Sequence, residues 1–245
     1  MKLTFLGTSH GYAELNRYTS CTLIEIGEKL YIVDAGGPVE YLLVNGGKNY
    51  ADIRGVFITH MHSDHVGSLD ALAEPFLRYR YNDKAVIYMP EKQGVDTFID
   101  WLTAMHASRA QIDATLHFKV TEPGVIFDAD GLTVEAIPTD HLGHGAYPAY
   151  AYHFTCSGRD VLFTGDMDIG FPDFERIVGD RHYNLVVCEM AHADLCNVIP
   201  KLQKLSTDRL VFNHAHIPRM EGYETLLRQL PFDAQWVCDG QSLIV

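Results

Sequence analysis

Short runs of hydrophobic residues alternate with polar turns along nearly the whole chain. Runs of this kind predict buried strands, and we expect them near residues 2–6, 21–26, 30–34, 55–58, 86–89, 124–127, 132–137, 148–155, 161–164, 185–188, 210–212 and 235–238. Apolar residues at helical spacing predict helices near 38–45, 67–79, 95–106, 195–205 and 221–230. Strands that alternate with helices indicate an α/β fold, which we expect to consist of two ββα-type halves.

One polar segment stands directly after the apolar run 56–58. Residues 59–65 read THMHSDH and bring together three imidazoles and a carboxylate. This combination suits zinc, manganese or iron, and a turn at the end of a strand fixes the directions of its side chains. We predict that His60 and His62 point to one side of the turn and bind one ion, while Asp64 and His65 face a second.

Further candidate ligands follow other predicted strands. His141 comes after the run 132–137, Asp166 after 161–164, and His214 after 210–212. Five histidines and two aspartates would satisfy two metal ions, with Asp166 as the natural bridge between them. The sequence therefore predicts a dinuclear metal site built at the ends of strands.

This ordered set of motifs resembles the metallo-β-lactamase fold superfamily. Within it, residues 3–9 (LTFLGTS), 16–20 (NRYTS) and 31–37 (YIVDAGG) are similar to ribonuclease Z and related phosphodiesterases. The resemblance implies a four-layer αββα sandwich and a single hydrolase domain over residues 1–245. It also implies a distribution of ligands, with His60, His62 and His141 on the first metal, Asp64, His65 and His214 on the second, and Asp166 bridging.

His192 is a separate candidate, outside this ligand set. It lies between the strand expected at 185–188 and the start of a predicted helix, where unpaired backbone N–H groups favour an anion. Enzymes similar to ribonuclease Z have a histidine in the corresponding place, which contacts the scissile phosphate and donates a proton to the leaving group. The residues around His192 differ from that family's, so a capping or solvent-exposed histidine stays open as the alternative.

Four more polar residues are candidates for supporting roles. In the resembling proteins the aspartate at the position of Asp34 orients a metal-bound histidine, although an aspartate before glycines also initiates turns. His10, His144 and His216 stand near the predicted ligands in sequence and are candidates to line the site or to contact substrate.

Composition agrees with one globular enzyme. The chain has 245 residues, of which 47% are hydrophobic, enough for one sizeable core. Its five cysteines are odd in number and scattered, which favours reduced thiols and a cytoplasmic location. No apolar run is long enough to predict a membrane span or a signal sequence. A homodimer is retained as an expectation for the quaternary state.

The charge balance bears on the substrate. The formal net charge is −13 and the pI about 5.3, so long polyanions should be repelled. RNA processing needs a basic footprint, and the nearest is residues 78–84, where Arg78, Arg80 and Lys84 alternate with tyrosines. Ribonuclease Z proteins also carry a glycine-rich arm that holds transfer RNA, and residues 66–140 contain no such insert. We therefore expect a small or cyclic phosphodiester as the substrate.

The expected chemistry is hydrolysis by a hydroxide shared between two divalent ions, with zinc the first choice and manganese the second. Asp64 would orient or deprotonate the water, and His192 would protonate the departing oxygen. Three alternatives stay open: ribonuclease Z-like RNA processing, a lactonase or thioesterase on the same scaffold, and a metal-binding protein without turnover.

Overall fold

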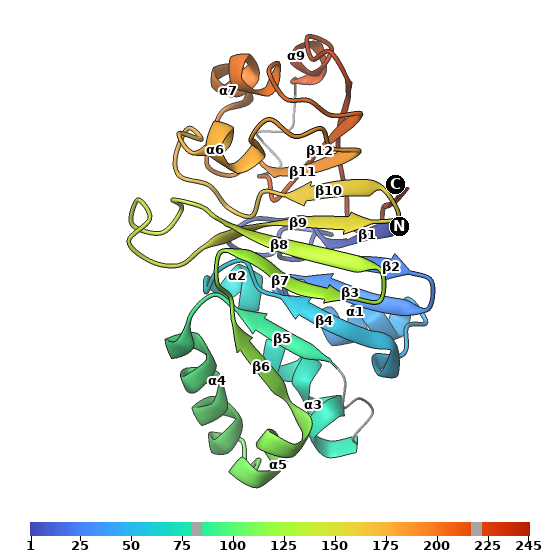
Figure 1. The fold of residues 1–245 in the computed structure, drawn as a ribbon, viewed down its shortest axis with the longest axis vertical. Coiled ribbons are helices and arrows are strands. Elements are labelled where there is room, and N and C mark those ends of the chain that lie inside the picture. Colours follow the sequence, from blue (N-terminus) through green and yellow to red (C-terminus); the bar gives the residue numbers. More distant parts are fainter. Residues whose placement is uncertain (80–84, 217–221) are drawn as a thin grey trace. The chain divides into compact units, whose positions relative to one another are not determined.

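The computed structural model of the protein describes residues 1–79, 85–216 and 222–245 (Figure 1). The chain divides into two compact units. Unit 1 consists of residues 1–7, 11–121 and 239–244, and unit 2 of residues 8–10, 122–238 and 245. The expectation of a single hydrolase domain over 1–245 stays a prediction.

Unit 1 contains a seven-stranded sheet in the order β14-β1-β2-β3-β4-β5-β6. Its strands are β1 (Lys2–Gly7), β2 (Cys21–Ile26), β3 (Lys29–Val33), β4 (Ile53–Phe57), β5 (Val86–Met89), β6 (His117–Val120) and β14 (Ser242–Ile244). The first three pairings in this order are antiparallel and the last three are parallel. The carboxyl ends of β3, β4 and β5 therefore lie at one edge of the sheet.

Unit 2 contains a second seven-stranded sheet in the order β13-β12-β11-β10-β9-β8-β7. Its strands are β7 (Gly124–Ala129), β8 (Leu132–Pro138), β9 (Tyr150–Cys156), β10 (Arg159–Phe163), β11 (Leu185–Glu189), β12 (Arg209–Asn213) and β13 (Asp233–Trp236). Read from β7, three antiparallel pairings are again followed by three parallel ones. Each unit thus repeats the same order of strand pairing.

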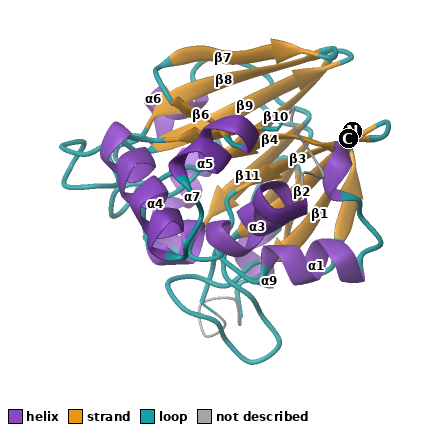
Figure 2. Cartoon of the chain, turned by 90° about the horizontal axis from the view of Figure 1, so that it is seen from below, coloured by secondary structure: helices purple, strands orange, loops and turns teal. Residues whose placement is uncertain are grey.

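Helices accompany both sheets (Figure 2). Unit 1 has α1 (Val39–Asn45), the short 3-10 helix η1 (Tyr50–Asp52), α2 (Ser63–Val66), α3 (Leu69–Tyr79), α4 (Lys92–Ala104) and α5 (Arg109–Thr115). Unit 2 has α6 (Phe174–Val178), α7 (Leu195–Leu202) and α9 (Glu224–Leu227). Ser108 caps α5 by accepting a hydrogen bond from the N–H of Gln111.

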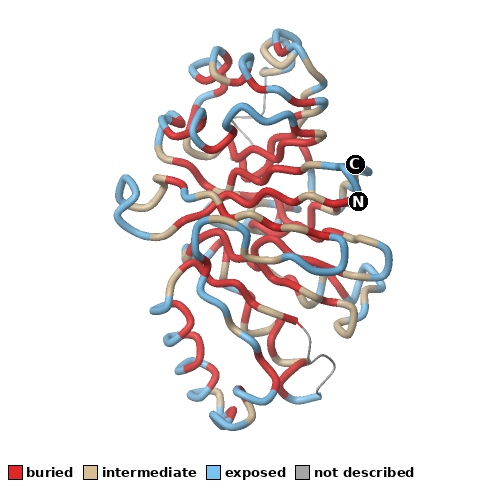
Figure 3. The backbone as a smooth tube through the Cα atoms, in the orientation of Figure 1, coloured by how far each residue is buried: buried red, intermediate tan, exposed pale blue. Residues whose placement is uncertain are grey.

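Each unit has its own hydrophobic core between strands and helices. In unit 1, alternate residues such as Ile32, Val56 and Ile87 point to the helix side, where they meet Leu72 of α3 and Leu102 of α4. In unit 2, residues of the central strands meet the apolar face of α7. Figure 3 shows the central strands mainly buried, whereas the helices alternate between buried and exposed residues.

Most of the predicted elements are present, with shifted ends and several omissions. The helix expected at 67–79 is α3, which begins at Leu69 after the unpredicted short helix α2, and the one expected at 195–205 ends at Leu202. The hydrophobic pattern did not predict β6, β14, α5 or α6, because these are short elements, and the two strands lie at sheet edges where few residues are buried. Arg80, Tyr81 and Lys84 of the basic segment, and residue 221 of the last predicted helix, lie outside the described residues.

No helix within residues 1–79, 85–216 and 222–245 is both long enough and apolar enough to cross a membrane.

Candidate functional site

The candidate ligands of unit 1 lie in the turn that follows β4 and leads into α2. We call His60, His62, Asp64 and His65 the ligand turn. The His60 ring lies 4.6 Å from the His62 ring and 4.1 Å from the His65 ring, measured between centroids. His60, Asp64 and His65 are buried, whereas His62 is exposed. The local fold therefore gathers the imidazoles that the motif predicted to be together.

A buried carboxylate from the neighbouring strand holds the ligand turn. Asp34 follows β3 and takes a left-handed backbone conformation with φ of 61°. Its carboxylate accepts hydrogen bonds from the Thr59 N–H at 2.8 Å, the Thr59 hydroxyl at 3.0 Å and the His65 Nδ1 at 2.7 Å. The expected contact between Asp34 and a histidine of the motif is present, and it turns His65 Nε2 toward Asp64 Oδ2, 3.5 Å away.

Asp64 has a second contact within unit 1. Its Oδ2 atom accepts a hydrogen bond of 2.6 Å from the N–H of Gly11, in the loop before β2. This bond fixes the orientation of the carboxylate and ties the loop to the ligand turn. An aspartate with one oxygen held by a backbone N–H is suited to positioning a neighbouring group with the other.

The backbone of the ligand turn is also clamped by the segment after Asp34. The Ala35 N–H donates to the His65 carbonyl at 2.7 Å, and the Ser68 N–H donates to the Ala35 carbonyl at 2.9 Å. At Gly36, a Cβ atom would lie 1.8 Å from the Asp64 carbonyl oxygen. Only glycine allows this close approach of the two segments.

We predict that Gly36→Ala destabilises the fold by more than about 2 kcal/mol, because the added methyl group would push the ligand turn away from β3. Urea unfolding measures the change in the free energy of unfolding. The matched control is Gly46→Ala, where the nearest atom to the new Cβ would be 3.2 Å away. Equal stability of the two variants would refute the clamp.

The candidate ligands of unit 2 follow three of its strands. We call His141, Asp166 and His214 the ligand group of unit 2. Asp166 is buried after β10, and its Oδ2 atom lies 3.2 Å from His214 Nε2 and 3.8 Å from His141 Nε2. The Nδ1 atom of His141 is hydrogen-bonded to the Met167 carbonyl oxygen at 3.2 Å. The sequence placed these residues at the ends of β8, β10 and β12, and the fold of unit 2 brings them together.

His214 has a backbone conformation that side chains rarely adopt. It directly follows β12, with φ of 49°. Such a conformation costs free energy and occurs often at functional positions. Its ring lies near that of His10, with 6.3 Å between centroids, and the His10 ring is 4.9 Å from that of His216. Two of the supporting histidines therefore stand beside a candidate ligand.

His144 stands apart from this group. Its side chain is 84% exposed, and its Nδ1 atom donates to Asp168 Oδ2 at 2.6 Å. This hydrogen bond is the main reason why the pKa of Asp168 lies below its ordinary value. Asp168 Oδ1 also accepts the Ile169 N–H at 2.8 Å, so the pair shapes the loop after Asp166.

His192 lies beside the ligand group of unit 2. Its ring is 4.6 Å from the His141 ring, and its Nδ1 atom is 3.8 Å from Asp166 Oδ2. Donor atoms of His141, Asp166 and His192 all lie within 4.8 Å of one another. The position is compatible both with a histidine that acts on substrate and with a metal ligand, and these two roles make different predictions.

Glu189 orients His192 and was not predicted from the sequence. This buried residue ends β11, and its Oε1 atom accepts hydrogen bonds from His192 Nδ1 at 2.9 Å and from the Met167 N–H at 3.0 Å. Its Oε2 atom accepts the N–H groups of Ala191 and His192 at 2.7 and 3.0 Å. The signal in the sequence was an acidic residue at the end of the apolar run 185–188, three positions before a candidate histidine.

We predict that Glu189→Gln lowers stability by roughly 2 kcal/mol, because an amide NH₂ would face backbone N–H donors that a carboxylate satisfies. It should also lower turnover of a phosphodiester, since His192 would lose its fixed orientation. Urea unfolding and steady-state kinetics measure the two effects, with Glu175→Gln as the control for an exposed glutamate on α6. A variant as stable and active as the wild type would rule out this role.

The donor set fits a divalent metal. Imidazole nitrogens and carboxylate oxygens are the usual ligands of zinc and are also suited to manganese. In unit 1, His65 Nε2 lies 3.5 Å from Asp64 Oδ2, and in unit 2, His214 Nε2 and His141 Nε2 lie 3.2 and 3.8 Å from Asp166 Oδ2. The described residues thus form two sets of histidine and aspartate ligands, one in each unit.

Solved structures with the same fold cover the whole chain. The metallo-beta-lactamase fold protein YhfI from Bacillus subtilis matches with a TM-score of 0.76 at 17% identity, over 99% of this chain and 98% of that one. The short form of human tRNase Z matches with a TM-score of 0.73 at 19% identity, over 100% and 99%. A diphosphatase from the PhnP family matches with a TM-score of 0.73 at 18% identity, over 100% and 97%. The expected fold class, an α/β sandwich of the metallo-β-lactamase type, is confirmed.

Curated relatives include ribonuclease Z proteins. That of Mycolicibacterium paratuberculosis is 28% identical over 177 residues, which are 68% of this chain and 62% of the relative. That of Synechococcus sp. (strain CC9311) is 29% identical over 158 residues, which are 62% of this chain and 48% of the relative. The match therefore spans about half to three fifths of these proteins' own length. The predicted relationship to ribonuclease Z and related phosphodiesterases is confirmed.

The sequence model of one protein family matches residues 1–232, nearly the whole chain, and that family is described as Anti-Pycsar protein Apyc1.

Proposed function

We propose, because this chain belongs to the Anti-Pycsar protein Apyc1 family, that it is a metal-dependent phosphodiesterase acting on a small cyclic phosphodiester such as a cyclic nucleotide. The fold, the family and the ligand sets support a hydrolase of the metallo-β-lactamase fold with histidine and aspartate clusters. The observation that carries the proposal furthest is the hydrogen bond from the half-buried His192 to the buried Glu189, beside the ligand group of unit 2.

The proposed metal centre is dinuclear, with the ligands that the sequence motifs predict. His60, His62 and His141 would hold one ion, Asp64, His65 and His214 the other, and Asp166 would bridge them. Bonds to protein partners support this arrangement, since His65 uses Nδ1 to reach Asp34 and His141 uses Nδ1 to reach Met167. In both residues Nε2 is then the ligand atom.

Bound ions would lower the pKa of a water molecule toward neutrality and neutralise charge that develops on the phosphate. The chain's own residues position the reactants. Asp64, with Oδ2 held by the Gly11 N–H, would orient the attacking water through its other oxygen. His192, held by Glu189, would bind a phosphate oxygen and deliver a proton to the leaving oxygen.

The acidic surface supports a small substrate over a long RNA. A net charge of −13 repels polyanions. The described residues of 66–140 form α3, β5, α4, α5, β6, β7 and β8, with no long inserted arm among them. Transfer RNA processing, lactone hydrolysis and thioester hydrolysis are therefore the alternative activities. The experiments below distinguish them from the proposed one.

One purified sample loaded with zinc, and a second with manganese, test the proposal. Elemental analysis should find close to two ions per chain, and His214→Ala should lose mainly one of them. The same samples should hydrolyse cyclic nucleotides and bis-(p-nitrophenyl) phosphate faster than a lactone or a thioester. Turnover of a lactone or thioester alone would assign a different hydrolase, and two bound ions without any turnover would leave a metal-binding protein.

We predict that kcat/KM for a cyclic nucleotide depends only weakly on salt, because a substrate with one phosphate releases few counterions when it binds. Cleavage of a precursor transfer RNA should be slow at every salt concentration. Initial rates of cyclic nucleotide hydrolysis and of precursor transfer RNA cleavage, at low and high potassium chloride concentration, measure the two salt dependences. Fast RNA cleavage that falls steeply with salt would restore ribonuclease Z-like processing.

A further inference from the structure

His141 lies in a loop of unit 2 that contains no helix or strand. The loop runs from the end of β8 at Pro138 to the start of β9 at Tyr150, and residues 143–147 are exposed. Exposed loops are mobile unless other elements hold them. A candidate ligand in such a loop therefore depends on contacts from outside the loop for a fixed direction.

The helix α6 and the residue before it supply these contacts. Asp173, at the N-terminus of α6, accepts a hydrogen bond of 2.7 Å from the Asp140 N–H through Oδ2. Arg176, within α6, donates from Nη1 to the Pro138 carbonyl at 2.6 Å and from Nη2 to Asp140 Oδ1 at 2.7 Å. Three hydrogen bonds thus hold the segment that directly precedes His141.

The hydrogen bond of Asp173 is unusual for its position. An aspartate at the start of a helix usually accepts an N–H group of that helix, but Asp173 makes no such bond with α6. Its side chain is fully buried, and Oδ1 has no hydrogen-bond partner among the described residues. Burial of a partly satisfied carboxylate costs free energy. What the carboxylate does provide is an acceptor for the Asp140 N–H and a charge 3.8 Å from Arg176 Nη2.

The loop that ends at Asp173 begins at another candidate ligand, Asp166. The Thr139 hydroxyl donates to the Asp166 carbonyl at 2.9 Å, and His141 Nδ1 is hydrogen-bonded to the Met167 carbonyl oxygen at 3.2 Å. The loop of His141 is therefore attached to both ends of the segment 166–173. Displacement of Asp173 would release one of these two attachments.

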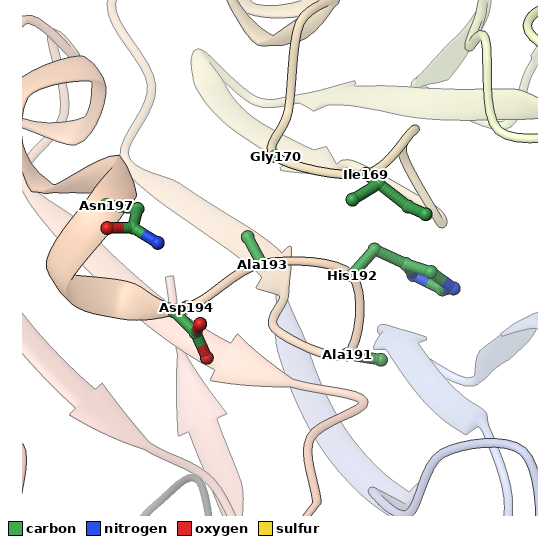
Figure 4. Close-up of a pocket in the computed structure, with 7 residues that line it drawn as sticks. All are labelled: Ile169, Gly170, Ala191, His192, Ala193, Asp194 and Asn197. Carbon is green, nitrogen blue, oxygen red and sulfur yellow. The ribbon is translucent and has the colours of Figure 1, made fainter.

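The same segment passes His192 on its way. The Gly170 N–H donates to the His192 carbonyl at 3.0 Å. Ile169 lies beside His192 (Figure 4), and both line a pocket of about 310 Å³. The imidazole of His192, however, is oriented by Glu189 of β11 and not by α6. Loss of the α6 contacts should consequently disturb His141 more than His192.

We propose that Asp173 and Arg176 are positioning residues for His141, which fix the loop and the ring whose Nε2 atom is the proposed metal ligand. The inference rests on the proposed function for the metal ion, while the contacts belong to the chain itself. With the preceding backbone held, His141 Nδ1 stays on the Met167 carbonyl oxygen and Nε2 stays 3.8 Å from Asp166 Oδ2. Residues that orient a ligand in this way change metal affinity by about ten- to a hundredfold.

Calorimetric titration of the metal-free full chain with zinc measures the first expected effect. Arg176→Gln and Asp173→Ala should each weaken the binding of one of two ions by about tenfold or more. Asp173→Asn keeps an acceptor for the Asp140 N–H and should bind that ion more tightly than Asp173→Ala does. The matched control is Arg181→Gln, because Arg181 is 49% exposed, against 47% for Arg176, and pairs with Glu135 of β8. It should bind both ions as the wild type does.

A measurement without metal separates this inference from the proposed function. Nitrogen-15 resonances of the histidine rings are recorded for the metal-free chain at about pH 8, where an ordinary imidazole is neutral. In the wild type His141 should carry its hydrogen on Nδ1, bonded to the Met167 carbonyl oxygen. Arg176→Gln should give a mixture of the two tautomers, whereas Arg181→Gln should match the wild type.

The two measurements fail in different ways. If the wild type binds two ions and Arg176→Gln binds both as tightly, the positioning role is wrong while the proposed function stands. If the wild type binds no ion but the His141 tautomer depends on Arg176, the positioning role stands while the metal centre is wrong. An unchanged His141 spectrum in folded Arg176→Gln overturns the inference. Since Arg176 is half exposed, this variant keeps the test decisive even if Asp173→Ala does not fold.

Discussion

Replacement of Asp166 by alanine is expected to lower phosphodiester turnover by more than about a thousandfold and to reduce the metal content. Its Oδ2 atom lies within 3.8 Å of nitrogens of His141, His192 and His214. Without this carboxylate, three neighbouring imidazoles lose their shared negative partner, and a bridging ligand would be missing from both ions. Loss of a residue that merely supports a ligand typically costs ten- to a hundredfold, so the expected effect is larger.

The matched control for this variant is Asp160→Ala. Asp160 likewise faces a histidine, with Oδ1 at 2.8 Å from His153 Nε2, but it lies near the start of β10, whereas Asp166 follows the end of that strand. Elemental analysis and kinetics on the two variants, both checked for folding by circular dichroism, measure the difference. If Asp166→Ala retains its metal and a rate within tenfold of the wild type, Asp166 is not a bridge.

Replacement of His192 by alanine is expected to lower kcat by about a hundredfold, the usual scale for a general acid, while both ions are retained. The position of His192, with a donor atom within 4.8 Å of donor atoms of His141 and Asp166, is compatible with metal binding as well. Its Nδ1 atom is hydrogen-bonded to Glu189, which leaves Nε2 as the atom that meets either substrate or metal. Metal content separates the two roles, because a ligand variant would lose an ion.

The choice of leaving group tests the proton transfer itself. The loss in His192→Ala should be smaller for an ester of p-nitrophenol, which departs without a proton, than for a cyclic nucleotide, which must protonate a sugar oxygen. His182→Ala is the control, since His182 pairs with Asp208 and Ser206 at exposed positions of unit 2. An equal loss for both substrates would leave His192 with phosphate positioning only.

The strands and the candidate ligands were predictable from the sequence for the same reason. Buried parallel strands are short apolar runs, and polar residues directly after them lie at one edge of a sheet. Asp166 and His214 follow β10 and β12 in this way. The edge strands β6 and β14 escaped prediction because edge residues are partly exposed, so their sequences lack a continuous apolar pattern.

Glu189 shows why part of the candidate site could not be predicted. Three of its four hydrogen-bond donors are backbone N–H groups, of Met167, Ala191 and His192. Backbone donors have no signature in the sequence, so the position of this glutamate after an apolar run did not reveal that its carboxylate is buried and holds His192. The pocket beside His192 was likewise invisible, because it depends on a bond between the Gly170 N–H and a backbone carbonyl.

The contacts of Asp34 bear on how the proposed metal ions would bind and leave. Thr59 and His65 are fixed by a buried carboxylate through bonds in which no ion takes part. The conformational entropy of ordering this turn, about 1–2 kcal/mol per residue, is therefore lost when the chain folds and not when an ion arrives. A chelator should strip the protein without unfolding unit 1, in contrast to small zinc domains that fold only around their metal. Ions would then exchange at a site that is already folded, so the metal bound there would depend on which metal the cell supplies.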